Sequence, residues 1–303
     1  MTALAIFGAA GQVGRELIEA ARAHGRPTLA FTHAEVDISR ADDVARGFQR
    51  IEREAPGCVV LNVAAYTGVD RAENDRDAAF AVNERGAGLL ASRCAAQGSA
   101  LIHLSTDYVF DGTKSAPYQE RDVPNPVNVY GASKLAGEEA VRASCPRHLI
   151  VRCSSVFGVF GRNFVETMLR AGREKPVLRV VDDQRSCPTA AADIAAAALR
   201  LVHAIESGQG RDLFGTYHFC GRPAVTWHAF AAAIFELAER CGLAPPRLEA
   251  INAADYRAAA RRPANAVLDC ARIEAAFGIQ APDWRDALGA TVEHFLGEGV
   301  KRK

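Results

Sequence analysis

A glycine-rich turn near the start of the chain constrains the fold more than any other feature. The apolar run at residues 4–7 leads into Gly8, Gly11 and Gly14, and a helical pattern follows over 13–23. Glycines at such a turn allow a tight bend, close approach of a diphosphate to the backbone and close packing of helix on strand. The helix N-terminus adds N–H groups and a positive dipole end. The spacing is GxxGxxG rather than GxGxxG, so the turn alone is also compatible with a purely structural role.

The rest of the first half alternates short apolar runs with helical patterns. Strands are predicted at 28–32, 58–62, 100–104 and 148–153, and helices at 44–54, 77–97 and 129–143. Strands that are apolar throughout are typical of a parallel sheet covered on both faces. The pattern therefore predicts an α/β protein with a doubly wound parallel sheet of the Rossmann type.

Beyond Cys153 the alternation is less regular. Helices are predicted at 163–173, 190–206 and 227–241, strands at 177–181 and 217–220, and short helices after the Pro245-Pro246 pair. We predict an NAD(P)-binding domain over 1–153 that is rejoined by about 183–220. Residues 154–182 and 221–303 then form a smaller, mostly helical C-terminal substrate-binding lobe.

Composition and charge exclude several classes of protein. With 36 Lys and Arg against 36 Asp and Glu, the net charge is zero, which argues against a non-specific nucleic-acid binder or a membrane-surface protein. No apolar run reaches the roughly 18 residues of a membrane span, and residues 1–3 lack a signal-peptide pattern. The eight cysteines form no CxxC pair, which favours reduced thiols over disulfides or a zinc site. We expect a cytoplasmic protein without a metal.

Tyr130 and Lys134 form a YxxxK motif at the start of a predicted helix, which places both on one face. A phenol with a pKa near 10 is a poor acid or base at neutral pH. An ammonium group one turn away is expected to lower that pKa, which suits alcohol–ketone chemistry. The motif alone also fits an incidental surface pair; downstream of the glycine turn it favours catalysis.

Two other segments reach the same edge of the predicted sheet. Thr106 follows the fourth strand, where open α/β sheets bind ligands, and its hydroxyl is placed to contact a substrate carbonyl or Tyr130. Residues 62–67 end the third strand with small side chains that leave room for a dinucleotide. The second strand ends at Phe31-Thr32-His33 without an acid, so nothing there repels a 2′-phosphate and NADPH is favoured over NADH.

Together these motifs resemble the extended short-chain dehydrogenase/reductases, and more closely the dTDP-4-dehydrorhamnose reductases. The resemblance covers most of the chain. It rests on GAAGQVG at 8–14, VDI at 36–38, NVAAYTGVDRAE at 62–73, STDYVFDG at 105–112, NVYGASKLAGE at 128–138, GRNFVETML at 161–169, DDQRSCPT at 182–189 and RRPANAVLD at 261–269.

The resemblance implies reduction, by NADPH or NADH, of the C4 ketone of dTDP-6-deoxy-L-lyxo-4-hexulose to dTDP-L-rhamnose. It implies a catalytic set of Thr106, Tyr130 and Lys134, with Tyr130 as proton donor. The implied cofactor-binding residues are Gly8, Gly11, Gln12, Val13, Gly14, Asp37, Ile38, Ala64, Ala65 and Tyr66, with Tyr130 and Lys134. The implied substrate-binding residues are Thr106, Asp107, Ser155, Asn163 and Arg261.

The chain departs from the family pattern at two places. Ser155 stands where relatives often carry a tryptophan in the sugar pocket, which keeps open another sugar-nucleotide 4-ketoreductase or epimerase, or a non-catalytic NADP-binding regulatory subunit. Some relatives use a glutamate after the PT motif in a magnesium-linked dimer contact. Here residues 190–192 are alanines and Asp193 follows, so we expect no magnesium, although Glu16 matches the other acidic position. The resemblance allows a homodimer. Arg162, Arg261 and Arg262 are candidates to contact the nucleotide diphosphate.

Overall fold

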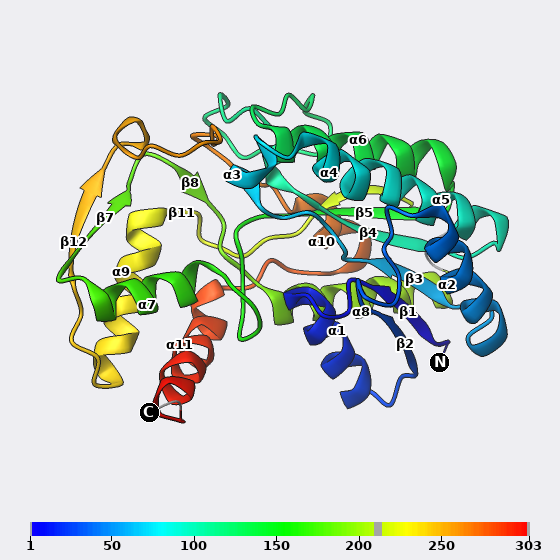
Figure 1. Ribbon diagram of the computed structural model, residues 1–303, viewed down its shortest axis with the longest axis horizontal. Helices are drawn as coiled ribbons and strands as arrows, with labels where there is room; N and C mark the ends of the chain where they lie inside the picture. Colours follow the sequence, from blue (N-terminus) through cyan, green and yellow to red (C-terminus); the bar gives the residue numbers. More distant parts are fainter. Residues whose placement is uncertain (1, 209–213, 302–303) are drawn as a thin grey trace.

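The computed structural model describes residues 2–208 and 214–301, and its centre is a six-stranded parallel sheet (Figure 1). The strand order is β10-β5-β4-β3-β1-β2, and every neighbouring pair is parallel. The bounds are Leu4–Phe7 (β1), Thr28–Phe31 (β2), Val59–Asn62 (β3), Leu101–Thr106 (β4), His148–Cys153 (β5) and Gly215–His218 (β10). The predicted doubly wound parallel sheet is confirmed.

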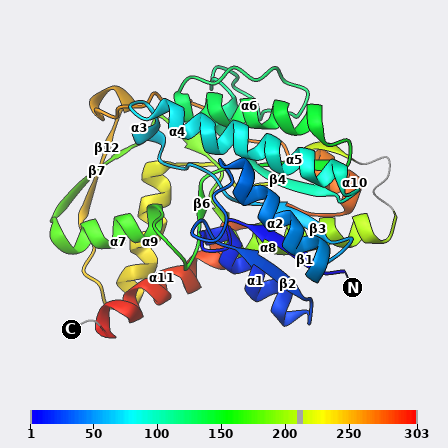
Figure 2. The same ribbon diagram turned by 45° about the vertical axis from the view of Figure 1, so that its right-hand side comes forward.

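Helices cover both faces of this sheet, as Figures 1 and 2 show. The helices are α1 (Gln12–Ala23) and α8 (Ala191–Glu206) on one face, and α2 (Ala41–Glu54), α5 (Ala87–Ala96) and α6 (Val129–Ser144) on the other. Within β1, Leu4 and Ile6 belong to the first core, whereas Ala5 and Phe7 belong to the second. Because successive side chains point to opposite faces, a strand buried on both sides is apolar throughout.

The predicted helix at 77–97 contains an irregularity in its middle. It is built from α4 (Arg76–Phe80), a π-helical segment (Ala81–Gly86) and α5, and the short α3 (Val69–Ala72) precedes it. A Cβ on Gly137 of α6 would lie 2.0 Å from the Asn83 carbonyl oxygen, so α6 packs directly on the π-helical segment. Such segments are frequent at functional sites, and this one packs against α6, which carries Tyr130 and Lys134.

The remaining elements gather at one end of the molecule, on the left in Figure 1. They include α7 (Phe164–Glu174), β7 (Val177–Val181), α9 (Trp227–Arg240), β12 (Arg247–Ile251) and α11 (Trp284–Lys301). Phe157, Phe230 and Trp284 lie in their common core. Short elements complete the chain: β6 (Val156–Phe157) with β9 (Thr189–Ala190), β8 (Arg185–Ser186) with β11 (Val225–Thr226), 3-10 turns at Asp107–Val109 and Ala253–Asp255, and α10 (Ala271–Phe277).

The prediction of only short helices after Pro245-Pro246 was wrong. Residues Arg247–Ile251 form β12, which pairs in parallel with β7, and α11 has 18 residues. The partner of β12 lies about 70 residues earlier in the chain, so this strand depends on a tertiary contact that no local pattern encodes.

The strand order reverses between β1 and β3, which fixes where a ligand binds. From β1 the chain moves to β2 on one side, whereas β3, β4, β5 and β10 follow one another on the other side. In open α/β sheets, ligands bind at the carboxyl ends of the strands at such a switch point. The glycine turn after β1 and the loop after β3 meet here.

Candidate active site

The glycine turn packs against the loop that follows β3. Gly8 has φ +89°, and a Cβ there would lie 2.5 Å from the Ala64 nitrogen. A Cβ on Gly14 would lie 2.3 Å from the Gly8 carbonyl oxygen. Both contacts exclude any side chain, so these glycines hold β1, α1 and the β3 loop together at the switch point.

The first turn of α1 is suited to bind a diphosphate. Among the described residues, the backbone N–H groups of Gln12, Val13 and Gly14 donate to no protein acceptor. The turn carries no acidic residue that would repel an anion. The geometry therefore fits the diphosphate of a dinucleotide.

The end of β2 carries a carboxylate that was not predicted from the sequence. Glu35 folds back so that its Oε2 accepts from the Thr32 backbone nitrogen (2.9 Å) and the Thr32 hydroxyl (2.8 Å). The hydrogen bond from the Thr32 backbone lowers the pKa of Glu35, which stays ionised. The prediction that no acid lies at this strand end was therefore wrong. The pattern Thr-x-x-Glu at 32–35, the signature of a capping box, is the signal that could have revealed it.

Asp37 and Ile38 lie in the loop beyond that strand end. The Asp37 Oδ1 atom accepts from the backbone nitrogen (3.0 Å) and hydroxyl (2.7 Å) of Ser39. Ile38 is buried, and a Cβ on Gly86 would lie 2.8 Å from its Cγ1 atom. The Asp37 carboxylate thus shapes its own loop, and Ile38 anchors that loop to the π-helical segment.

The loop after β3 is held by two buried asparagines. Asn62 accepts from the Ala64 backbone nitrogen at 3.2 Å. Asn83 accepts from the Tyr66 nitrogen at 2.9 Å and donates to the Tyr66 carbonyl oxygen (3.1 Å) and the Ser133 hydroxyl (2.9 Å). Asn83 therefore ties the Ala64–Tyr66 loop to the catalytic helix. Asn83 was not predicted from the sequence, where its only local signal is a polar residue on the buried face of a helical pattern.

Helix α6 and strand β4 bring the predicted catalytic residues together. Lys134 is almost fully buried, and its Nζ donates to the Leu104 carbonyl oxygen at 2.7 Å. Tyr130, one turn earlier, shares a hydrogen bond with the Thr106 hydroxyl at the end of β4. The Asn128 side chain caps the helix by accepting from the Gly131 nitrogen at 2.7 Å.

The protonation states differ from our expectation. Burial raises the pKa of Tyr130 to about 12, although its hydrogen bond with Thr106 opposes the shift. Burial lowers the pKa of Lys134 to about 8, against the opposing charge of Glu138. The predicted lowering of the tyrosine pKa by Lys134 is therefore wrong for the protein without ligands. Burial dominates, and the ammonium group contacts the Leu104 carbonyl.

Asp107 is buried next to Thr106. The Thr106 hydroxyl donates to its Oδ1 (2.9 Å) and the Ser154 hydroxyl donates to its Oδ2 (2.6 Å). Burial raises the pKa of Asp107 to about 6. In this arrangement Asp107 orients the Thr106 hydroxyl.

A buried ionic network extends from the catalytic helix. Glu138, one turn beyond Lys134, accepts from the Ser105 hydroxyl (2.6 Å), from Arg152 Nε and Nη2 (2.8 and 2.6 Å) and from Arg142 Nη2 (2.6 Å). Although burial alone would raise the Glu138 pKa, Arg152 holds it below its usual value. Tyr130, Lys134 and Glu138 thus contact three successive residues of β4. The i, i+4, i+8 spacing is the signal that could have added Glu138 to the sequence analysis.

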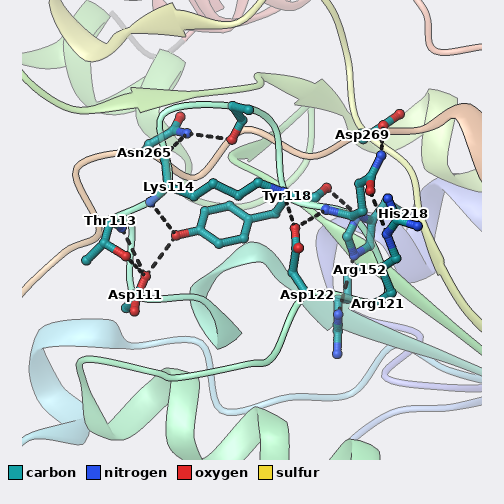
Figure 3. Close-up of polar contacts among 12 residues, drawn as sticks. Asp111, Thr113, Lys114, Tyr118, Arg121, Asp122, Arg152, His218, Asn265 and Asp269 are labelled. Carbon is teal, nitrogen blue, oxygen red and sulfur yellow. Dashed lines mark hydrogen bonds and ion pairs between the residues drawn. The ribbon is translucent and has the colours of Figure 1, made fainter.

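Figure 3 shows how the segment after β4 is fixed to the C-terminal part of the chain. Asn265 Nδ2 donates to the Lys114 carbonyl oxygen at 2.7 Å, and the Tyr118 nitrogen donates to the Val267 carbonyl oxygen at 2.8 Å. The Tyr118 hydroxyl donates to Asp111 at 2.8 Å. These contacts place the RRPANAVLD segment beside residues 114–118, which follow β4.

The expected substrate-binding residues on the C-terminal side differ in what they contact. Ser155 has φ +43°, an uncommon backbone conformation for a residue with a side chain. Asn163 caps α7 through the Glu166 nitrogen (3.2 Å) and donates to the Gln12 side chain (3.1 Å), which joins the glycine turn to this lobe. The exposed Arg261 side chain has no ion-pair partner among the described residues.

The other two candidate arginines also differ from each other. Arg262 forms a two-point ion pair with Asp70, with N–O distances of 2.7 and 3.1 Å. Arg162 is exposed, and its side chain has no carboxylate partner in the described ranges. Arg262 thus links the C-terminal segment to α3, whereas Arg162 and Arg261 are free to meet an anion.

The switch-point turn, the Tyr130–Lys134 pair and the parallel sheet define a dinucleotide-dependent reductase of the short-chain dehydrogenase/reductase class. Residues 1–296 match the family described as the RmlD substrate binding domain. The chain belongs to this family, that of the dTDP-4-dehydrorhamnose reductases.

Curated relatives and solved structures agree with this membership. The dTDP-4-dehydrorhamnose reductase of Aggregatibacter actinomycetemcomitans is 43% identical over 95% of this chain and 97% of its own, and that of Sinorhizobium fredii is 40% identical over 98% of each. The crystal structure of the reductase from Clostridium acetobutylicum superposes with a TM-score of 0.87 at 32% identity, covering 96% of this chain and 99% of that one. The Bacillus anthracis enzyme in complex with NADP gives 0.86 at 33% identity, covering 98% and 100%.

Within residues 2–208 and 214–301, no three or more His, Cys, Asp or Glu side chains are grouped so as to hold a metal ion. Over the same ranges, no helix is both long enough and apolar enough to span a membrane. Glu16 and Asp193 lie near each other: burial raises the pKa of Glu16, and Glu19 and Asp193 raise it further.

Proposed function

We propose that the protein reduces the C4 ketone of a dTDP-4-keto-6-deoxy sugar with NADPH, and that its substrate is dTDP-4-dehydro-L-rhamnose. The observation that carries the proposal is the convergence of Thr106, Tyr130 and Lys134 at the sheet edge where the Gly8 turn also ends. The reductase relatives at 40–43% identity over nearly the whole chain support the same substrate. NADPH, when bound, supplies the hydride.

The chain's own residues then bind the cofactor, orient the substrate and protonate the substrate carbonyl oxygen. The free N–H groups at the start of α1 bind the cofactor diphosphate, and Lys134 holds the nicotinamide ribose. Because the pKa of Tyr130 is about 12, its hydroxyl carries a proton at neutral pH and donates it to the substrate carbonyl oxygen. The Thr106 hydroxyl, which donates to Asp107 in the protein without ligands, turns its proton toward that oxygen and donates a second hydrogen bond to it.

We also propose the finer assignments. Gly8, Gly11, Gln12, Val13, Gly14, Asp37, Ile38 and the Ala64–Tyr66 loop bind the cofactor, while Ser155, Asn163 and Arg261 face the nucleotide sugar. Residues 1–153 with about 183–220 form the cofactor domain, and the rest forms the substrate lobe. The eight free cysteines favour a reducing compartment, in keeping with a cytoplasmic enzyme. A homodimer is our proposed assembly, and light scattering tests it.

The test follows NADPH absorbance with dTDP-4-keto-6-deoxy sugars as substrates. We expect oxidation of NADPH, and Tyr130→Phe abolishes turnover while NADPH binding persists. Tyr217→Phe is the matched control, because Tyr217 packs on Phe277 in the sheet core, and we expect this variant to keep wild-type activity. Tight NADPH binding without turnover of any 4-keto nucleotide sugar would instead favour the regulatory subunit. Turnover of a different 4-keto sugar would favour another substrate at Ser155.

A further inference from the structure

Three thiols from distant parts of the chain meet beside the catalytic site. Cys187 lies between β8 and β9, Cys220 follows β10, and Cys270 caps the N-terminus of α10. The Sγ atoms of Cys220 and Cys270 are 3.6 Å apart, and the Cys220 thiol also hydrogen-bonds to that of Cys187. Cys187 and Cys220 are buried, whereas Cys270 is partly exposed. The proposed reduction uses none of these thiols.

Short polar contacts join this cluster to the catalytic residues. The Cys187 nitrogen donates to the Ser154 hydroxyl at 3.3 Å, and that hydroxyl donates to Asp107 at 2.6 Å. Asp107 accepts in turn from the Thr106 hydroxyl. The path from the Cys187 backbone to Thr106 therefore contains only two intervening side chains.

The backbone around Cys220 packs directly on the Cys187 segment. The Gly221 nitrogen donates to the Thr189 hydroxyl at 3.1 Å, and that hydroxyl donates to the Cys187 carbonyl oxygen at 2.9 Å. A Cβ on Gly221 would lie 2.1 Å from the Pro188 carbonyl oxygen. With no free space between the two segments, a movement of Cys220 displaces Cys187 as well.

We propose that Cys270 and Cys220 form an oxidation site for hydroperoxides, at which a disulfide links the two residues. The Cys270 thiolate attacks the peroxide oxygen, the O–O bond breaks, and an alcohol or water leaves as Cys270 becomes a sulfenic acid. The Cys220 sulfur then attacks the Cys270 sulfur and water leaves. In sum, two thiols lose two electrons and two protons, and the peroxide is reduced to alcohol and water.

The assignment of roles follows from exposure and contact. Cys270 is the member of the cluster that a peroxide can reach from solvent, and Cys220 is the thiol whose sulfur it touches. Bond formation requires the sulfurs to approach from 3.6 Å to about 2.05 Å. The hydrogen bond with Cys220 lowers the pKa of Cys187. Cys187 is therefore a third thiol, next to the Cys220–Cys270 disulfide, that can exchange with it.

The disulfide displaces the Cys220–Gly221 segment and, through Cys187 and Ser154, the Asp107 carboxylate that orients Thr106. We therefore expect oxidation to slow the ketone reduction. This consequence rests on the proposed function, whereas formation of the bond does not.

The experiment treats the full-length protein with hydrogen peroxide, counts thiols after denaturation and maps linked peptides. We expect the wild type to fall from eight titratable thiols to six, with Cys220 linked to Cys270. Cys220→Ser and Cys270→Ser abolish that link. Cys241→Ser is the matched control, since Cys241 is exposed and outside the cluster, and it forms the same link as the wild type.

Eight thiols remaining in the wild type would overturn the proposal, as would a wild-type peptide map in which Cys220 is linked to Cys187 instead of Cys270. Should Cys220→Ser fail to fold, the peptide map of the wild type still decides. Reductase activity is followed in parallel, and we expect it to fall on oxidation and return with dithiothreitol. A mapped disulfide with an unchanged rate would refute the coupling to Asp107. A protein inactive before oxidation would refute the proposed function and leave the thiol count to decide the oxidation site.

Discussion

Replacing Glu138 by glutamine tests whether the buried ionic network supports the catalytic helix. The Glu138 side chain is fully buried and accepts four hydrogen bonds, two of them from the guanidinium group of Arg152, whose side chain is 2% exposed. Glutamine keeps the shape but removes the charge, so Arg152 is left as an uncompensated buried cation. Breaking a buried pair in this way costs about 3–5 kcal/mol, out of a total stability of about 5–15 kcal/mol.

The assay is urea denaturation, with the midpoint and slope of each variant compared with the wild type. Glu166→Gln is the matched control, because Glu166 pairs with Arg170 at 3.6 Å and the Arg170 side chain is 61% exposed. Such an exposed pair contributes about 0.5 kcal/mol or less. The double variant Glu138→Gln with Arg152→Gln is expected to recover part of the loss, because it leaves no unpaired charge at Arg152. Equal stability of the Glu138 and Glu166 variants would refute the reasoning.

Three further predictions concern the cofactor site and the catalytic lysine. Because the pKa of Lys134 is lowered to about 8, its positive charge is present below that pH. We therefore expect kcat/KM for NADPH to fall as the pH rises through about 8. A profile that stays flat to about pH 10 would contradict this. Glu35→Gln removes a negative charge at the end of β2. We expect it to raise the preference for NADPH over NADH, measured as the ratio of kcat/KM values, by on the order of 1 kcal/mol, or about fivefold. An unchanged ratio would place Glu35 away from the 2′-phosphate. Gly8→Ala should lower the melting temperature and NADPH affinity far more than Gly25→Ala, because both glycines have positive φ but only at Gly8 would the Cβ collide with backbone.

Local pattern was sufficient for most of the sheet and its helices. The strands β1 to β5 are short apolar runs, and their backbone hydrogen bonds and two buried faces leave few alternatives to a parallel α/β sheet. The π-helical segment and β12 were not predicted, since each depends on a partner far along the chain: Gly137 for the first and β7 for the second.

The candidate catalytic residues were predicted from their spacing in the sequence, whereas their surroundings were not. Tyr130 and Lys134 are one helical turn apart, so their common face follows from the sequence. Their pKa values do not, because burial in the folded protein is the main cause of both shifts. The position of the Glu35 carboxylate was not predicted from local pattern either, because it reaches the end of β2 only where the chain folds back on Thr32.

By itself, the sequence determined the class of fold and the position of the glycine turn, and it predicted Tyr130 as the proton donor. Hydrophobic periodicity, glycine spacing and the separation of two residues by one helical turn are all properties of short segments, so they can be read from the sequence alone. Only the tertiary structure decided which charges are buried, which carboxylate supports Thr106, and that Cys187, Cys220 and Cys270 share one cluster. Burial and contact between segments far apart in the chain are created by packing, which no local pattern contains.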